Sequence, residues 1–377
     1  MQQDCVVVGA SFAGLACATA LAGSGARVTV LERKHDPGGK LHTTGILVRD
    51  VIEQVPLLDG LPGGLVRRIN GMRLYAPNMS CVDLAAPGYF FLATDTPGLM
   101  RWLAAHAAAA GVTLRLGVGF TRAAREGSGF FLGDDLGRTR FLVGADGPKS
   151  TVARVLGLGE NRHFLAGIEH EYAHVQIDEP DRLHCFIDRQ LMPGYIGWVV
   201  QGVGVVQVGL ARRLRGGDGA AVKASMAAFL AKIAPLFRFG VPAAVRAGLI
   251  PCGGIVERVA APRVLLVGDA AGMVSPVTAG GIHMALKHGL ATGHAIADFL
   301  SGRGEDPARD VRASYPTLGA KRVLRFLFDH FQSDLAFNLL LGTRPMRRAA
   351  SLIYFHRRGV FNEPPARAAR GRAARSR

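Results

Sequence analysis

Three small residues near the N-terminus have the spacing of a turn that can hold phosphate. Gly9, Ser11 and Gly14 follow a short apolar run at residues 6–8. In such a turn the first position needs a tight bend, the second lets the backbone approach a pyrophosphate, and the third lets a helix pack closely on the strand. The free N–H groups and the positive end of the following helix dipole would then face the phosphates.

A carboxylate completes this pattern. Glu32 ends the next apolar run and is positioned to bind ribose hydroxyls. A strand, a helix, a second strand and a glutamate in this order favour a dinucleotide-binding unit over a glycine-rich turn with a chance glutamate. Glu32 is compatible with both NAD and FAD, so the turn by itself leaves the cofactor open.

Two further segments place an aspartate directly after an apolar strand. "FLVGADGPKSTVAR", residues 141–154, carries Asp146 and Gly147, and "RVLLVGDAAGMVSPVTAGG", residues 263–281, carries Asp269. An aspartate at such a place is also a good N-cap for a helix, and this is the alternative reading of Asp269. What sets the second segment apart is the run of small residues after the carboxylate.

These three segments, in this order, resemble the fingerprints of the flavin-dependent hydroxylase and geranylgeranyl reductase superfamily over about residues 1–320. The resemblance implies FAD. It implies that Asp269 binds a ribityl hydroxyl, that Asp146 shapes the fold around the pyrophosphate, and that the backbone at Gly280, Gly281 and Ile282 lies near the flavin ring, where negative charge develops on reduction. It also implies FAD contacts from Ala13, Arg33, Lys40, Val118 and Gly147.

Within the superfamily, the third segment favours one branch. Aromatic-ring hydroxylases usually read GDAAH, whereas this chain reads GDAAG followed by "SPVTAGGI", which resembles geranylgeranyl reductases. "PGYIGWVV", residues 193–200, resembles a Tyr/Trp-rich strand of that branch, so Tyr195 and Trp198 are expected to line an apolar substrate pocket or, alternatively, to pack the core. The chain departs from the branch at Val200–Gln201, at Thr96 and in "GGKLHTTG", where His42 is a candidate acid.

The resemblance implies hydride transfer from reduced FAD to a C=C bond of an isoprenoid or other lipid-like substrate, with the proton from an acid or water. The alternatives are a monooxygenase acting on an aromatic or polyketide substrate, and a flavoprotein whose FAD is structural. No second dinucleotide fold follows, so NAD(P)H would bind transiently or a reduced protein would deliver the electrons.

The remaining pattern predicts the elements that hold these residues. A strand, a helix ending at residues 23–25 and a second strand open the chain, and an antiparallel hairpin with one covered face turns near residues 202–204. We expect an α/β fold, a doubly wound (Rossmann-like) FAD-binding domain with an inserted, largely antiparallel substrate domain and a helical C-terminus. The expected boundaries are 1–60, 92–165 and 262–310 for the first domain, 61–91 and 166–261 for the second, and 311–362 for the helices, before a basic disordered tail at 363–377.

The C-terminal region combines apolar and basic residues. Spacing predicts one helical stripe, broken by Pro345 and followed by a basic amphipathic stretch; the stripe comprises Leu324, Leu327, Phe328, Phe331 and Leu335. We expect this stripe to cap the insert; the alternatives are part of a substrate tunnel or a peripheral contact with a membrane surface. The tail itself fits either anionic lipid or plain solvent exposure.

Composition narrows the remaining classes. The 377 residues are 49% hydrophobic and 20% charged, with a net charge of +16, which predicts a globular chain. The five cysteines show no metal-binding or disulfide spacing, so we expect no metal and a reducing cytoplasm. We expect no signal peptide, no apolar run that spans a bilayer and, without a nucleic-acid-binding motif, no nucleic-acid partner.

Overall fold

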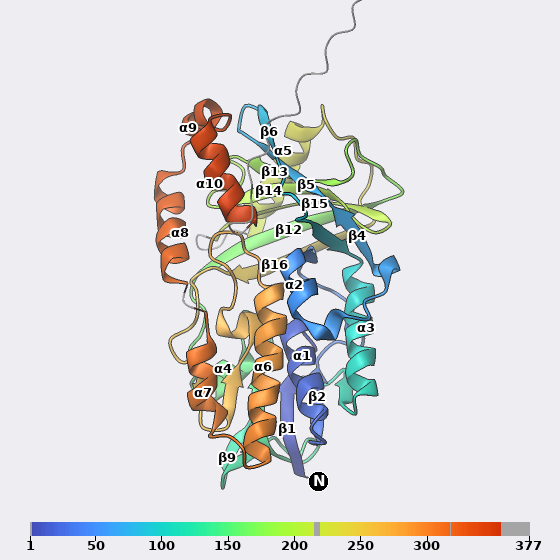
Figure 1. Ribbon diagram of the computed structural model, residues 1–377, viewed down its shortest axis with the longest axis vertical. Helices are drawn as coiled ribbons and strands as arrows, with labels where there is room; N and C mark the ends of the chain where they lie inside the picture. Colours follow the sequence, from blue (N-terminus) through green and yellow to red (C-terminus); the bar gives the residue numbers. More distant parts are fainter. Residues whose placement is uncertain (1, 215–218, 317, 356–377) are drawn as a thin grey trace, which may run out of the picture.

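A computed structural model describes residues 2–214, 219–316 and 318–355 and has the predicted fold class. In Figure 1 a sheet with its helices forms the lower half of the molecule, and a second sheet crosses the upper half. A small third sheet, ordered β3-β7-β4, joins the two halves. Its strands are β3 (Ile46–Val48), β4 (Val66–Ile69) and β7 (Phe91–Thr94).

The lower sheet is built around β1 (Gln2–Val8), which pairs in parallel with both β2 and β11. Cys5 through Val8 are all buried, as expected for a continuous apolar run in a parallel sheet. The strand order is β17-β18-β11-β1-β2-β8, with β9 and β10 at one side. The strands are β2 (Val28–Glu32), β8 (Thr113–Leu116), β9 (Ala124–Glu126), β10 (Gly129–Phe131), β11 (Arg138–Gly144), β17 (Ala260–Ala261) and β18 (Val264–Leu266).

Two helices far apart in the sequence, α1 (Phe12–Ala22) and α6 (Ile282–Leu300), lie side by side over this sheet (Figure 1). They approach closely because α6 carries Gly289 and Gly293 at the contact. A Cβ on Gly289 would lie 2.4 Å from the carbonyl oxygen of Ala13, and one on Gly293 would lie 2.4 Å from that of Cys17. The glycines at this contact therefore hold the helix after the first predicted segment close to the helix after the third, at residues 263–281. The other helices of this half are α2 (Arg49–Gln54), α3 (Thr96–Ala109), α4 (Thr151–Val155) and α7 (Pro307–Ser314).

The upper sheet is largely antiparallel, in the order β16-β12-β15-β14-β13-β5-β6; only β13 and β5 pair in parallel. The predicted hairpin is confirmed, with β14 (Ile196–Gln201) and β15 (Val205–Arg213) flanking the turn. Helix α5 (Gly219–Ile233) covers one face of the sheet. The other strands are β5 (Gly71–Tyr75), β6 (Cys81–Leu84), β12 (Phe164–Ala173), β13 (Arg182–Ile187) and β16 (Ala244–Pro251).

The expectation of a single covered face on this sheet is wrong. Val206, Val208 and Leu210 of β15 pack under α5, but Gln207 and Gly209 on the opposite face are buried as well. This second face lies against the lower half of the molecule. Because of this contact the sheet is covered on both sides.

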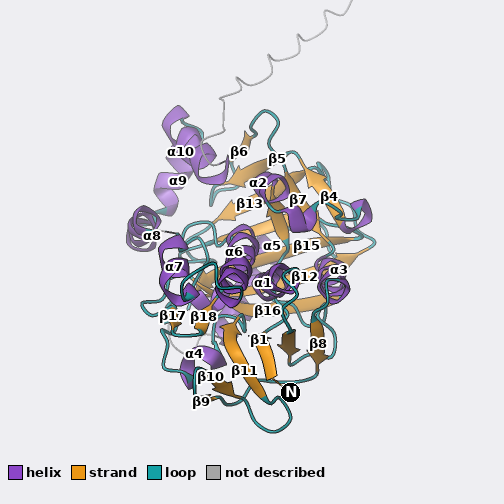
Figure 2. Ribbon diagram, turned by 60° about the horizontal axis from the view of Figure 1, so that its bottom comes forward, coloured by secondary structure: helices purple, strands orange, loops and turns teal. Residues whose placement is uncertain are grey.

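The C-terminal stripe is also not one helix. Helix α8 (Gly319–Phe331) ends before Ser333, whose side chain caps α9 (Asp334–Leu340), so Leu335 belongs to a different helix from Leu324. Pro345 lies in the first turn of α10 (Arg344–Phe355), a position that proline tolerates, and so begins a helix rather than breaking one. Figure 2 shows α8, α9 and α10 at the rim of the molecule. Of the helices that the structure describes, none is long and apolar enough to cross a bilayer. The predicted tail lies outside the described residues.

Candidate functional site

The predicted phosphate-binding turn joins β1 to α1. Gly9 has φ +105°, and a Cβ there would lie 2.4 Å from the carbonyl oxygen of Ala145, so only glycine fits. A Cβ on Gly14 would meet the carbonyl oxygen of Gly9 at 2.1 Å. Ser11 is the N-cap of α1, and its hydroxyl accepts a hydrogen bond from the N–H of Gly14. The helix thus starts directly above the end of the central strand, where a pyrophosphate can approach its N-terminus.

Glu32 ends the neighbouring strand β2 and lies across this turn. Its Oε2 accepts from the N–H of Ala10 and its Oε1 from that of Lys34, both at 3.0 Å. Two bonds leave the carboxylate with capacity for ribose hydroxyls. Val118 follows β8 and donates its N–H to the carbonyl oxygen of Glu32, so it lies beside this carboxylate. Arg33 and Lys40 are exposed in the loop that follows β2.

Asp146 follows β11 and is engaged within the fold. Its carboxylate accepts from the Ser150 hydroxyl at 2.6 Å and from the N–H groups of Thr151 and Val152, and so holds the start of α4. Gly147 has φ +84° and lets the chain turn away from the strand.

Asn161 ties the second and third segments together, and its role was not predicted. Its Nδ2 donates to the carbonyl oxygens of Pro148 and Asp269, at 3.1 and 2.9 Å. An asparagine between motifs has no distinctive sequence signal, so only the structure reveals the bridge.

Asp269 is half-buried at the end of β18, in the single helical turn Gly268–Ala271. Burial raises the pKa of its carboxyl from 3.8 to about 6. No hydrogen-bond donor within the described part of the chain reaches this carboxylate, which therefore suits a hydroxyl-bearing ligand better than the alternative N-cap role. The following loop leads to Gly280 and Gly281, and Gly281 is the N-cap residue of α6 without a side-chain cap. The N–H groups at Ile282 are thus available to a ligand.

The carboxyl ends of β18, β11, β1 and β2 lie next to one another at one edge of the sheet. This edge carries Asp269, Asp146, the phosphate-binding turn and Glu32. A steric cradle for pyrophosphate, a carboxylate for ribose and a half-buried carboxylate for the ribityl chain fit FAD.

The loop at residues 38–45 reaches from this edge to the upper sheet. His42 is exposed and packs over Gly248, and its Nδ1 hydrogen-bonds the carbonyl oxygen of Ala247 in β16. Because a carbonyl oxygen only accepts, Nδ1 carries the proton, which leaves Nε2 to exchange a proton with a ligand. The hydroxyl of Thr96 donates to the carbonyl oxygen of Thr44 and so supports this loop.

Tyr195 and Trp198 both reach the face of the upper sheet that lies against the lower half. The Tyr195 hydroxyl donates to the carbonyl oxygen of Thr278 in the loop before α6, and burial raises its pKa. An apolar cluster surrounds them beside this loop: Leu165, Ile196, Ala211, Ile250, Cys252 and Ala279. Both predicted residues therefore lie in the apolar surface next to the predicted flavin edge.

A buried carboxylate at this place was missed. Glu169 of β12 is only 4% exposed, and its Oε2 accepts from the Thr44 hydroxyl at 2.6 Å and from Nε1 of Trp198 at 3.0 Å. Burial raises its pKa, although these two bonds oppose the shift. In the sequence, "GIEHEYA" reads as a strand with a solvated charged face, so nothing distinguishes this glutamate without the fold.

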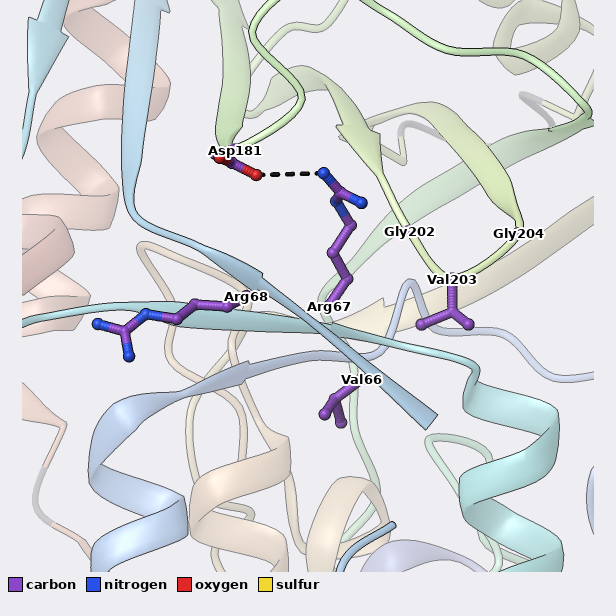
Figure 3. Close-up of a pocket in the computed structure, with 7 residues that line it drawn as sticks. All are labelled: Val66, Arg67, Arg68, Asp181, Gly202, Val203 and Gly204. Atoms are coloured by element: carbon purple, nitrogen blue, oxygen red, sulfur yellow. Dashed lines mark hydrogen bonds and ion pairs between the residues drawn. The ribbon is translucent and has the colours of Figure 1, made fainter. Parts of the chain in front are cut away.

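A surface pocket of about 490 Å³ lies elsewhere, between the turn after β14 and strand β4 (Figure 3). Nη2 of Arg67 and Oδ1 of Asp181 lie 3.1 Å apart and form an ion pair at the wall of this pocket. It includes none of the predicted cofactor residues, and its polar, open walls do not suit an apolar substrate. No metal-binding group of three or more His, Cys, Asp or Glu side chains occurs among the residues that the structure describes.

A nucleotide-binding edge that faces an apolar sheet is typical of a flavoprotein oxidoreductase. The family model described as "FAD binding domain" matches residues 2–325, and the chain belongs to this family. It is an enzyme, an FAD-dependent oxidoreductase of the geranylgeranyl reductase and flavin monooxygenase superfamily.

Named relatives agree with this membership. Digeranylgeranylglycerophospholipid reductase 2 of Methanopyrus kandleri is 30% identical over 317 residues, which cover 80% of this chain and 78% of the relative. Menaquinone reductase of Mycolicibacterium smegmatis is 30% identical over 349 residues, which cover 84% and 80%. The crystal structure of a geranylgeranyl bacteriochlorophyll reductase-like protein of Thermoplasma acidophilum superposes with a TM-score of 0.82 at 18% identity, over 95% of this chain and 97% of that one, which supports the shared fold.

Proposed function

We propose that this enzyme reduces C=C bonds of an isoprenoid or other lipid-like substrate. When bound, FAD supplies the hydride that such a reduction needs. The observation that carries the proposal is the apolar cluster around Tyr195 and Trp198, which lies directly beside the loop before α6. The names of the relatives, which are reductases of a geranylgeranylated phospholipid and of menaquinone, point to the same class of substrate.

The floor of the proposed substrate site is flat because glycines face one another across its strands. Gly167 of β12 pairs with Gly248 of β16, and Gly209 of β15 pairs with Glu169 and with Trp198. A Cβ on Gly209 would lie 2.4 Å from the Trp198 ring, so the indole lies directly on this glycine. The glycines therefore let the Trp198 indole and His42 lie directly on the sheet, and the indole provides one apolar wall of the proposed site.

The protein also offers protonatable groups to complete the reduction. The first group is Nε2 of the His42 imidazole. The second is the carboxyl of Glu169, because burial raises its pKa. Glu169 also positions the indole of Trp198 and the loop at Thr44. We propose that NAD(P)H or a reduced protein supplies the electrons, since no second nucleotide-binding motif follows the first.

Anaerobic reduction of the purified holoenzyme with a chemical reductant, followed by addition of a geranylgeranylated lipid or menaquinone, tests the proposal without knowledge of the natural donor. We expect reoxidation of the flavin without oxygen and a product heavier by two hydrogen atoms. A product heavier by one oxygen atom, formed only in air from an aromatic substrate, would instead show a monooxygenase. A flavin that no reductant reaches would show a structural cofactor.

Two tryptophan substitutions, one in the proposed site and one outside it, give a matched comparison. Trp198→Ala removes the wall of the proposed site and should lower turnover of the prenyl lipid by about tenfold or more, with FAD retained. Trp102→Ala, in α3, removes the same side chain away from the site and should leave the turnover of the folded enzyme unchanged.

A further inference from the structure

Helix α8 is amphipathic, but its polar face points inward. Arg325, Asp329 and Gln332 recur at i, i+4 and i+7, and they lie on the face that packs against the molecule. Arg325 is 4% exposed, whereas Phe331, on the opposite face, is 72% exposed. In a helix that caps a core the reverse arrangement is expected. The predicted role of this stripe as a cap on the insert is therefore wrong for α8.

Polar contacts fix this orientation. The Asp329 carboxylate pairs with Arg325 of the same helix and with Arg213 of β15. Gln332 accepts the N–H of Gly194 at 2.9 Å through its Oε1. Turning α8 to bury its apolar side would take Asp329 away from Arg213 and Gln332 away from the Gly194 N–H, which is unfavourable for partly buried groups.

Exposed apolar side chains are concentrated on the three C-terminal helices. Thirteen large apolar residues of the described chain are exposed, and nine of them lie here. Scattered apolar residues are normal on a surface, whereas a concentration of this kind indicates a binding surface. We call this group the C-terminal apolar face: Val323, Leu324, Phe326, Leu327, Phe331, Leu335, Leu339, Leu340 and Leu352.

Positive charge accompanies the apolar face. Within α8–α10 the basic side chains outnumber the two acidic ones, and both acids are already engaged: Asp329 with arginines and Asp334 with the N–H of Arg189. Basic residues beside the face therefore lack acidic neighbours on these helices; they are Lys321, Arg322, Arg344 and Arg347. A second copy of this chain, also with a net charge of +16, would be repelled, whereas an anionic lipid surface would be attracted.

We propose that the C-terminal apolar face is a peripheral docking surface for an anionic lipid bilayer. Apolar side chains enter the interface, basic residues bind lipid headgroups, and no helix needs to cross the membrane. The inner side of α8 also contacts the substrate side of the enzyme, because Arg325 Nη1 donates to the carbonyl oxygen of Pro276, in the loop before α6. A docked enzyme would thus hold its proposed apolar site close to the lipid; this last step alone rests on the proposed function.

Vesicle flotation with the full-length holoenzyme tests the surface. We expect binding to vesicles that contain phosphatidylglycerol and much weaker binding to pure phosphatidylcholine. The triple change Phe331→Ser, Leu335→Ser and Leu339→Ser should lower the partition coefficient by about tenfold or more, since each side chain contributes apolar area. The matched control changes three exposed apolar residues of the insert, Leu236→Ser, Val241→Ser and Val245→Ser, and should bind as the unchanged enzyme does.

A double charge reversal tests the electrostatic part of the proposal. It remains informative if the triple serine variant fails to fold. Arg322→Glu with Arg344→Glu should weaken binding to anionic vesicles by more than about tenfold, because two attractive charges are lost and two repulsive ones are added. Lys223→Glu with Arg238→Glu makes the same charge change on the insert and should have little effect.

Three results would overturn the proposal. The first is a full-length enzyme that ignores anionic vesicles. The second is unchanged binding of the triple serine variant, which would assign any binding to the basic tail alone. The third is a stable dimer that the triple variant dissociates without any change in vesicle binding. Because none of these measurements depends on turnover, they stand apart from a failure of the proposed reaction.

Discussion

The hydroxyl of Thr44 donates a 2.6 Å hydrogen bond to Oε2 of Glu169, and this bond joins the loop after β2 to the upper sheet. The indole of Trp198 donates to the same oxygen at 3.0 Å. One buried carboxylate thus fixes both the loop and the aromatic wall of the proposed substrate site. Bonds to a charged acceptor are stronger than those between neutral groups, so we regard Glu169 as the positioning residue of this site.

Glu169→Ala should lower the free energy of unfolding by about 1–3 kcal/mol, because it leaves the Trp198 N–H and the Thr44 hydroxyl buried without an acceptor. The emission of Trp198 should shift as its indole loses its fixed partner, and comparison in a Trp102→Phe background isolates this signal. Glu169→Gln keeps the shape and one acceptor oxygen, and it should therefore shift the emission less. Identical spectra for both variants and the unchanged enzyme would contradict the positioning role.

The same carboxylate should make stability depend on pH. Burial raises the pKa of Glu169 above its ordinary value of 4.5, so the unfolded chain releases this proton before the folded one. The contribution of Glu169 to the free energy of unfolding therefore falls as the pH rises above 4.5, until the folded form also ionises. Urea unfolding at about pH 5 and about pH 8 should show a smaller loss of stability in Glu169→Gln than in the unchanged enzyme. An equal loss in both would assign the pH dependence to other groups.

Asp269→Ala should affect the apoenzyme and the holoenzyme in opposite directions. It should weaken FAD binding by about 10- to 100-fold, since a charged acceptor for a ribityl hydroxyl is lost. In the apoenzyme the pKa of this carboxyl is about 6 instead of 3.8, so the unchanged protein loses stability as the pH rises through this window. Above it the alanine variant should be the more stable of the two without FAD.

Fluorescence titration of the apoenzyme with FAD and urea unfolding without FAD measure the two effects separately. Asp134→Ala, an exposed aspartate on the turn before β11, is the control and should change neither. An alanine variant that binds FAD as tightly as the unchanged enzyme would remove Asp269 from the cofactor site.

The phosphate-binding turn could be predicted, and so could the places of Glu32, Asp146 and Asp269 at the ends of strands, because each depends on a few adjacent residues. Gly9 and Gly14 are required by backbone geometry within one turn, and Glu32 follows from the length of one helix. These requirements are visible in the sequence itself. The resemblance to known fingerprints then distinguished FAD from NAD.

What the sequence could not reveal depends on contacts between distant segments. Glu169 alternates with apolar residues, as a solvated strand residue also would, and only its pairing with Thr44 and Trp198 shows that it is buried. The apolar stripe of α8 was visible, but periodicity does not tell which face packs inward. Arg213, more than a hundred residues away, determines this by pairing with Asp329.

Gly289→Ala tests the close contact between α1 and α6. Alanine favours helices by about 1 kcal/mol over glycine, but a Cβ here would lie 2.4 Å from the backbone oxygen of Ala13 and cannot move aside as a flexible side chain would. Forced separation of the helices should outweigh the helical preference and lower the free energy of unfolding by about 1–3 kcal/mol.

Because Ala13 also packs against Gly268, beside Asp269, the same change should weaken FAD binding, which titration of the apoenzyme measures. Gly219→Ala, at the exposed start of α5 with open space around it, is the control and should leave stability within about 0.5 kcal/mol. A gain in stability from Gly289→Ala would mean that α1 and α6 lie farther apart than the structure has them, and that the phosphate-binding turn does not depend on this contact.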